Sequence, residues 1–278
     1  MGSSRKIIRG QRCFGARGHT RAGFPTPPAR ARELYLASAT PVYYPQTGQA
    51  YLGRREEFFL GAKGGHNSES HNHNDVGNFV LFANCLPVLV NLGVNANSYG
   101  RVTEETGLSK YDTFSVNSDY HNCPAPNGVR QSPGISYCAS SSECEPSEGY
   151  YRLDIAGAYP SESSCRSLFR TFSLDGSKMI LSDLVSLRSR TGADKEYFMT
   201  PCTVSAEREG CLILTYGSAV SVRMKYPLSL SVEVEQVNLV EENSTLSDYW
   251  GETINRIVLT SAVDAPLENL YRFEFEIL

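Results

Sequence analysis

The residues best suited to chemistry lie in one short segment, GGHNSESHNHNDVGNF, residues 64–79. Three of the five histidines of the chain, His66, His71 and His73, fall within eight positions of it. Imidazoles at this density can bind a metal ion, act as a catalytic base or belong to a hydrogen-bonded polar loop. If the segment is extended, side chains alternate, so His71, His73 and Asp75 share one face with Cα atoms about 6.6 Å apart. Two imidazoles placed in this way could converge on one zinc ion.

A fourth histidine, His121, lies far along the chain in the segment NSDYHNCPAPNGVRQ. A zinc site with two or three histidine ligands needs an imidazole from such a distant segment. His66 precedes the extended part of the first segment and is predicted to be structural or to lie at the rim. A metal site, a catalytic base and a polar loop all stay open on these residues alone.

The elements expected to position these histidines are β-strands. The segment FVLFANCLPVLVNLG holds two short apolar runs with a turn near Asn84, and Asp175-Gly176 separates two strand-like runs, so both segments predict hairpins. The segments LSLSVEVEQV and YRFEFEIL alternate apolar and polar residues, as strands with one dry face do. The residues predicted for the dry faces are Leu228, Leu230, Val232 and Val234 in the first segment and Tyr271, Phe273, Phe275 and Ile277 in the second.

Helical periodicity is nearly absent after residue 40, and no repeat of fixed period is present. The sequence therefore predicts an all-β fold, a large antiparallel β-sandwich (supersandwich-like) over residues 41–278. Residues 1–40 are rich in Arg, Gly and Pro and are predicted to form a short irregular basic lead-in, with one helix candidate, ARARELYLASA. Residues 138–150, CASSSECEPSEGY, are predicted to be a surface loop.

Composition narrows the classes of function. The chain has 278 residues, of which 41% are hydrophobic and 20% charged, as in an ordinary globular protein. A net charge of −4 without charged blocks in the bulk of the chain gives no case for nucleic acid as a partner. No window is long and apolar enough to predict a membrane span. The arginine-rich start lacks the hydrophobic core of a signal peptide, and the compartment stays open.

The eight cysteines contain no CxxC pair, so a cysteine-based zinc site is not expected. Cys138 and Cys144 are near enough in sequence to bridge a loop, but free thiols are equally compatible with a chain of this length.

Three segments, in the same order, resemble the β-sheet domain of the heparinase II/III-like polysaccharide lyases. They are FFLGAKGGHNSESHNHNDVGNFVLFANCLPVLVNLGV, KYDTFSVNSDYHNCPAPNGVRQ and LDIAGAYP. The resemblance covers residues 50–190 closely and the remaining strands loosely. Members of that family are bacterial enzymes that cut uronic-acid-containing polysaccharides, such as heparan or alginate, by β-elimination. In the family an α/α toroid packs on the sandwich, and the active site lies in the cleft between them.

The resemblance implies a structural zinc ion and its ligands. It assigns zinc binding to His73, the second His of the HxH triplet, and to His121 of the YHN motif. A further ligand position falls on Asn91, where the family usually has Asp. An amide oxygen binds zinc more weakly than a carboxylate does, and Asp75 is a nearby residue that could compensate. Zinc is expected to hold the site together rather than to take part in the chemistry.

The resemblance also implies a catalytic or substrate-facing role for His71, and we add Asn72 and Tyr120 as predicted substrate-binding residues. In the family a Tyr and a further His of the toroid complete the catalytic set, and the residues before the sandwich are too few to encode a toroid. We therefore predict the metal-binding half of a lyase, either a fragment of a longer gene product or one piece of a split enzyme whose toroid acts in trans, and we expect it to be inactive without the toroid domain. Its expected partner is an anionic polysaccharide or oligosaccharide.

Three alternatives stay open. The chain could be a non-catalytic saccharide-binding sandwich or a degenerate lyase remnant with no activity. A more distant alternative is a cupin-like metal enzyme that uses His71, His73 and His121, although no Glu lies at a matching ligand spacing.

Overall fold

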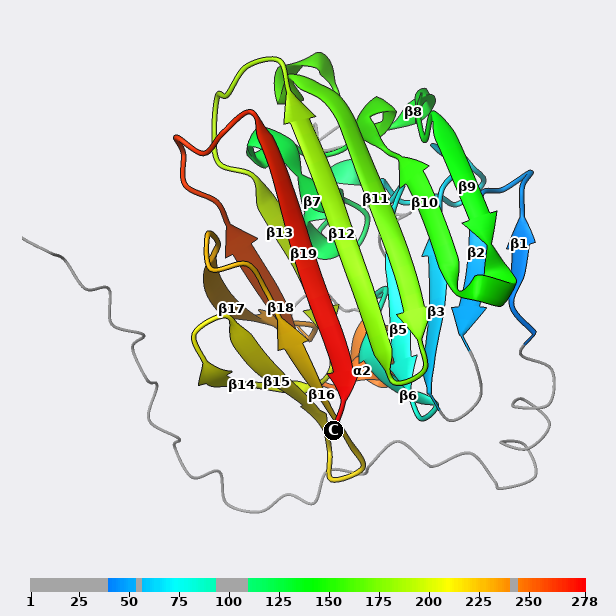
Figure 1. Ribbon diagram of the computed structural model, residues 1–278, viewed down its shortest axis with the longest axis vertical. Coiled ribbons are helices and arrows are strands. Elements are labelled where there is room, and N and C mark those ends of the chain that lie inside the picture. Colours follow the sequence, from blue (N-terminus) through cyan, green and yellow to red (C-terminus); the bar gives the residue numbers. More distant parts are fainter. Residues whose placement is uncertain (1–39, 54–56, 94–109, 241–244) are drawn as a thin grey trace, which may run out of the picture. The chain divides into compact units, whose positions relative to one another are not determined.

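The computed structural model describes residues 40–53, 57–93, 110–240 and 245–278, which form antiparallel sheets (Figure 1). The largest sheet has the strand order β14 (Thr203–Arg208), β15 (Cys211–Tyr216), β16 (Val220–Lys225), β19 (Glu268–Ile277), β12 (Lys178–Leu187), β11 (Cys165–Asp175), β10 (Tyr150–Asp154) and β9 (Ser141–Glu145). A five-stranded sheet has the order β1 (Val42–Tyr44), β2 (Gln49–Gly53), β3 (Phe58–Lys63), β5 (Phe79–Ala83) and β6 (Leu86–Leu89).

Two smaller sheets and a few short helical turns complete the described residues. A four-stranded sheet has the order β17 (Ser231–Asn238), β18 (Thr253–Thr260), β13 (Lys195–Thr200) and β7 (Pro124–Ala125), and β4 (His66–Asn67) pairs with β8 (Gly134–Cys138). The 3₁₀ turns are η2 (Lys110–Asp112), η3 (Ser118–Tyr120), η4 (Pro126–Gly128), η5 (Pro146–Glu148), η6 (Ala156–Ala158) and η7 (Ser161–Ser163), and α2 (Leu246–Trp250) is a short α-helix.

The core lies between the eight-stranded sheet and the two sheets behind it (Figure 1). Phe79 of β5 meets Phe172 of β11 with ring centroids 5.2 Å apart, and Phe198 of β13 meets Phe273 of β19 at 5.1 Å. All four rings are buried, and edge-to-face contacts of this kind stabilise a core beyond the area that they bury. The predicted all-β antiparallel sandwich is confirmed.

Both predicted hairpins are present. Ala83 pairs with Leu86, so Asn84 and Cys85 form the two-residue turn between β5 and β6, with φ values of 50° and 64°. The other turn lies one residue further along than expected, because Asp175 still pairs with Lys178. Gly176, with φ of 58°, begins that turn, where glycine tolerates the left-handed backbone without strain.

The predicted burial of the apolar faces is correct for one of the two alternating segments and only partly correct for the other. In β19, Tyr271, Phe273 and Phe275 are buried as predicted, because this strand lies inside the eight-stranded sheet. In LSLSVEVEQV, Leu230 is buried, but Leu228 precedes β17 and is 70% exposed. Val234 is 43% exposed, because β17 is an edge strand of the four-stranded sheet.

Three further predictions concern loops, thiols and membrane contact. Residues 138–150 are not simply a surface loop, because β9 forms the edge of the eight-stranded sheet there. The cysteines of the described residues are free thiols, Cys138 and Cys144 among them. Among the described residues we find no helix with the length and apolar character of a membrane span. The predicted lead-in and its helix candidate lie outside the described residues.

Candidate metal centre

The histidine-rich segment forms a loop rather than the extended strand assumed from its alternation. After β4 the chain turns, with the Asn72 amide donating to the Glu69 carbonyl at 3.2 Å, and His71 has φ of 57° in the left-handed region. This reversal turns the His71 side chain out to solvent, while His73 and Asp75 are buried. The three side chains therefore do not share one face, because a left-handed residue breaks the alternation of an extended chain.

Two buried amide side chains hold the loop around Asp75. Asn67 accepts a hydrogen bond from the Asp75 amide at 3.1 Å and donates to Gln131 Oε1 at 3.0 Å. Gln131 in turn binds both backbone groups of Val76, accepting at 3.0 Å and donating at 2.7 Å. Buried polar groups that are satisfied in this way fix a single loop conformation, which positions the Asp75 carboxylate.

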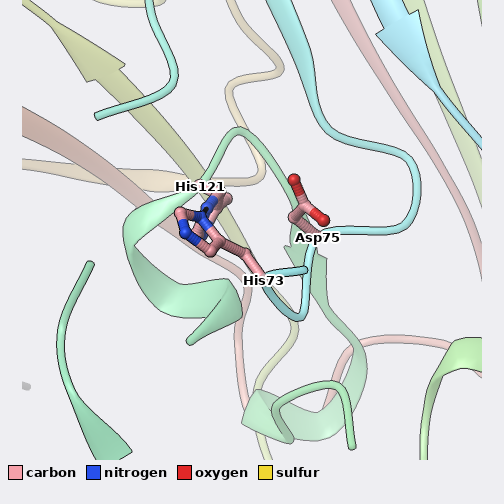
Figure 2. Close-up of side chains that lie close together, drawn as sticks. All are labelled: His73, Asp75 and His121. Carbon is pink, nitrogen blue, oxygen red and sulfur yellow. Dashed lines mark hydrogen bonds between the residues drawn. The ribbon is translucent and has the colours of Figure 1, made fainter. Parts of the chain in front are cut away.

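His121 follows η3, and its ring lies beside that of His73, as Figure 2 shows. His73 Nδ1 and His121 Nε2 are 3.0 Å apart, and their ring centroids are 5.1 Å apart. Ligand-type atoms of His73, Asp75 and His121 all lie within 4.8 Å of one another, and all three residues are buried. The structure therefore brings together the HxH segment and the YHN segment that the sequence singled out.

Hydrogen bonding assigns the protons of the two imidazoles. His121 Nδ1 lies 2.8 Å from the Asn117 carbonyl, which can only accept, so this nitrogen carries a proton. Burial lowers the pKa of His121 against the opposing effect of Asp75, which favours the neutral ring with a lone pair on Nε2. His73 Nδ1 is then the donor in the 3.0 Å contact. Metal binding through that atom requires its proton to move to Nε2 of the same ring.

Lys63, at the end of β3, contacts the carboxylate of Asp75. Its Nζ lies 2.6 Å from Asp75 Oδ1 and 3.6 Å from Glu69 Oε2. Burial alone would raise the pKa of Asp75, but Lys63, followed by His121 and His73, outweighs it and lowers the pKa. Asp75 is therefore a carboxylate in the buried site. No pattern in the sequence indicated that Lys63 is part of this site.

Arg170 of β11 connects the two loops that carry the site. Its Nη1 donates to the Gly77 carbonyl at 2.9 Å and to the Asn122 carbonyl at 2.6 Å. Its Nε and Nη2 bind both oxygens of Asp183 at 2.8 and 2.7 Å. Because Gly77 follows Asp75 closely and Asn122 follows His121, this fully buried guanidinium fixes the distance between the two halves of the site.

The remaining predicted site residues have other contacts. Asn72 is buried and donates to the carbonyl of the next residue at 2.9 Å. The Tyr120 ring is half-buried, with the Arg256 guanidinium 4.2 Å from its centroid. Asn91 Oδ1 accepts a hydrogen bond from the Gly93 amide at 3.0 Å. The substrate-binding roles of Asn72 and Tyr120 and the metal-binding role of Asn91 stay predictions.

The donor set fits zinc. Two imidazole nitrogens and one carboxylate oxygen form a common three-ligand zinc site that leaves one position for water or another ligand. The bond from His121 to a backbone carbonyl is the outer contact that orients a metal-binding imidazole. Between His73 and Asp75, Asn74 Oδ1 is buried without a hydrogen-bond partner in the described part of the chain. His73, Asp75 and His121 would hold the ion.

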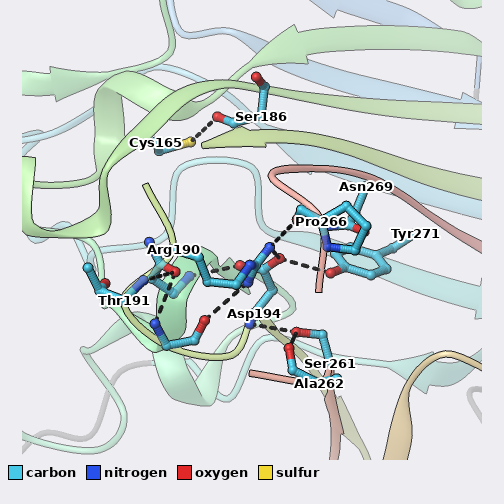
Figure 3. Close-up of polar contacts among 12 residues, drawn as sticks. Cys165, Ser186, Arg190, Thr191, Asp194, Ser261, Ala262, Pro266, Asn269 and Tyr271 are labelled. Atoms are coloured by element: carbon cyan, nitrogen blue, oxygen red, sulfur yellow. Dashed lines mark hydrogen bonds and ion pairs between the residues drawn. The ribbon is translucent and has the colours of Figure 1, made fainter. Parts of the chain in front are cut away.

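A second polar cluster, shown in Figure 3, lies in the loop between β12 and β13. The Asp194 carboxylate accepts from Arg190 at 3.0 Å, from the Tyr271 hydroxyl at 2.8 Å and from the Asn127 amide at 2.8 Å. Both carboxylate oxygens are thus used within the protein. The cluster fixes the loop against η4 and β19, so we assign it a structural role.

The fold is similar to solved structures of heparinases and heparan sulfate lyases. Heparan sulfate lyase HepC from Pedobacter heparinus matches with a TM-score of 0.64 at 12% sequence identity. A heparinase III gene product matches with a TM-score of 0.63 at 15% identity, and a further heparinase III with 0.58 at 14%. Each match covers 86% of this chain and 36% of the other, so the chain spans about a third of the length of these proteins. No sequence family and no curated protein matches the chain.

Proposed function

We propose that this chain is the metal-binding half of a polysaccharide lyase that cleaves uronic-acid-containing polysaccharides by β-elimination. The observation that carries the proposal is the buried cluster of His73, Asp75 and His121 beside the exposed His71. The similarity of the sandwich to heparinase III and to a heparan sulfate lyase supports a heparan-like substrate. Alginate-like uronates have the same reactive carboxylate and belong to the same substrate class.

Elimination at a uronate makes three demands on a site. The carboxylate must be neutralised so that the C5 proton becomes acidic, a base must take that proton, and an acid must protonate the departing glycosidic oxygen. Histidine suits the base role because its ordinary pKa lies near neutrality. His71 is the exposed imidazole of the cluster segment and is our candidate for the base or for the group that binds the carboxylate.

The metal in this proposal has a structural role. His73, Asp75 and His121 are 7%, 4% and 0% exposed, so an ion held by them would be shielded from a polysaccharide. When bound, zinc would supply positive charge that offsets Asp75 and would crosslink the two loops. His71 lies two residues before the first ligand, so crosslinked loops hold its backbone in place.

In this proposal the substrate cleft lies between the sandwich and an α/α toroid. The toroid is either another part of a longer protein or a separate chain that acts in trans. Base and acid must lie on opposite sides of the sugar, each within hydrogen-bond reach. His71 supplies one side. We therefore expect the chain by itself to bind uronate oligosaccharides weakly and to show no elimination.

The test is the rise in ultraviolet absorbance of the unsaturated uronate product, measured on heparan, chondroitin and alginate. The chain alone should give no rise, and His71→Ala should weaken its binding of heparan oligosaccharides. A clear rise that His71→Ala abolishes would show that the sandwich suffices for catalysis. Oligosaccharide binding that is unchanged in His71→Ala would favour the non-catalytic saccharide-binding alternative.

A further inference from the structure

Lys63 has a position that the proposed chemistry does not explain. Its side chain is 18% exposed, and its Nζ lies 2.6 Å from Oδ1 of Asp75, whose carboxylate belongs to the cluster that would bind the metal. The backbone fixes the two residues together, since the Gly77 amide donates to the Lys63 carbonyl at 2.7 Å and the Lys63 amide donates to the Asn78 carbonyl at 2.9 Å. The backbone before β5 therefore holds Lys63 and Asp75 next to each other.

The charge of Asp75 needs a counter-charge. Its side chain is 6% exposed, and a buried carboxylate is strongly destabilising unless a cation or several donors compensate it. A divalent metal on the cluster would provide that compensation. Lys63 provides it as well, through one short, charge-assisted hydrogen bond.

We infer that Lys63 is a built-in cation that takes the place of a metal ion at Asp75. The inference rests on the proposed metal site. It has two consequences: the sandwich folds without metal, and it binds divalent metal more weakly than its three ligands alone would allow. Metal and ammonium compete because both need the same carboxylate and repel each other at this distance.

Glu69 gives Lys63 a second acceptor when a metal binds. Its Oε2 lies 3.6 Å from Lys63 Nζ, and its side chain is 30% exposed. An ammonium displaced from Asp75 can therefore remain paired by turning toward Glu69. Glu69 belongs to the turn that contains His71, because its carbonyl accepts the Asn72 amide. Metal binding is thereby linked to the segment that carries the exposed imidazole.

A different role for Lys63 makes the opposite prediction. If Lys63 served to orient Asp75 for the metal, as outer partners of ligands do, its removal would weaken metal binding. If Lys63 replaces the metal, its removal leaves a buried, uncompensated carboxylate and strengthens metal binding. The sign of the change in affinity separates the two roles.

The experiment compares the zinc affinity of the unaltered chain and of Lys63→Met by competition with a chromophoric chelator. Lys63→Met should bind zinc at least about tenfold more tightly. Its melting temperature should fall in chelator and recover in zinc, whereas that of the unaltered chain should change little in chelator. Lys63→Arg keeps the charge and should behave like the unaltered chain. Lys178→Met removes one charge at an exposed surface pair with Glu276 and controls for net charge.

Each outcome decides the question. Unchanged or weaker zinc binding in Lys63→Met, or a loss of folding in this variant that zinc does not restore, overturns the inference and leaves the metal site standing. If neither protein binds zinc, both the inference and the proposed metal site fail. Tighter binding that disappears when His121→Ala is added to Lys63→Met supports the inference and locates the ion at the cluster.

Discussion

Glu196 is a buried carboxyl group that shares Arg170 with Asp183. Both carboxylate oxygens of Asp183 accept hydrogen bonds from the Arg170 guanidinium. Glu196 Oε2 lies 3.4 Å from Arg170 Nη2, which is a long distance for a charge-assisted hydrogen bond. Glu196 Oε1 has no hydrogen-bond partner in the described part of the chain. Burial, together with the charge of Asp183, raises the pKa of Glu196 well above its ordinary value. Glu196 is therefore the member of this group that keeps its proton.

We predict that Glu196→Gln stabilises the protein at neutral pH by about 1 kcal/mol. A carboxyl group whose pKa is raised on folding contributes its full stabilisation below its unfolded pKa, near 4.5, and loses it as the pH rises toward the folded pKa. Gln does not titrate, so the advantage of the variant should vanish at about pH 4.5 and grow with pH.

Thermal unfolding of both proteins from about pH 4.5 to about pH 8.5 measures this difference. The control is Glu209→Gln, which changes an exposed carboxyl group and should leave the pH profile unaltered. A variant that is less stable than the unaltered chain throughout this range would mean that Glu196 is ionised and paired with Arg170.

At the residue scale, the sequence predicted part of the candidate site. The HxH spacing and the YHN motif identified His73 and His121, which meet at 3.0 Å although 48 positions separate them. Asp75 was named as a substitute ligand, but on an extended strand that does not form, because His71 is left-handed. Lys63 escaped detection because a lysine at a strand end is ordinarily solvated, and its burial beside Asp75 depends on the folded loop.

Among the elements, the turn residues of the sequence predicted the hairpins, but the sequence did not show which strands lie at the edges of the sheets. A turn near Asn84 and the Asp175-Gly176 pair were readable because turns depend on a few adjacent residues. Alternation alone does not distinguish an inner strand such as β19 from an edge strand such as β17, because both carry period-two patterns. The position of a strand in its sheet depends on partners that are distant in sequence.

Arg170 is the connection between elements that we expect to matter most for the site. We predict that Arg170→Lys lowers the free energy of unfolding by about 3 to 5 kcal/mol, since it breaks a buried network and loses the planar fork. Zinc affinity should fall by about 10- to 100-fold, because the Asp75 and His121 loops lose their shared donor. Denaturant unfolding and zinc competition measure the two effects.

Arg166→Lys, at an exposed position on the same strand, is the matched control and should change neither quantity. Unaltered zinc affinity in a folded Arg170→Lys protein would mean that the two loops hold the site without the guanidinium.

At the scale of the whole molecule, the sandwich class was predictable and its assembly was not. The alternating strands and the scarcity of helical periodicity sufficed for an all-β antiparallel fold. The pairing of β12 with β19, which joins Lys178 to Glu276, had no signal in the sequence. Faces are encoded locally, but which strands pair depends on the packing of the entire core. The division into several sheets therefore required the structure.

X-ray absorption at the zinc edge tests whether His73, Asp75 and His121 form a metal centre, and this claim would be contradicted by other ligands. The protein would be loaded with one equivalent of zinc, beside His121→Ala and His71→Ala. We predict nitrogen and oxygen ligands at about 2.0–2.1 Å with two imidazoles, one of them lost in His121→Ala and both retained in His71→Ala. Sulfur ligands at about 2.3 Å, or a zinc spectrum without imidazole ligands, would contradict the claim.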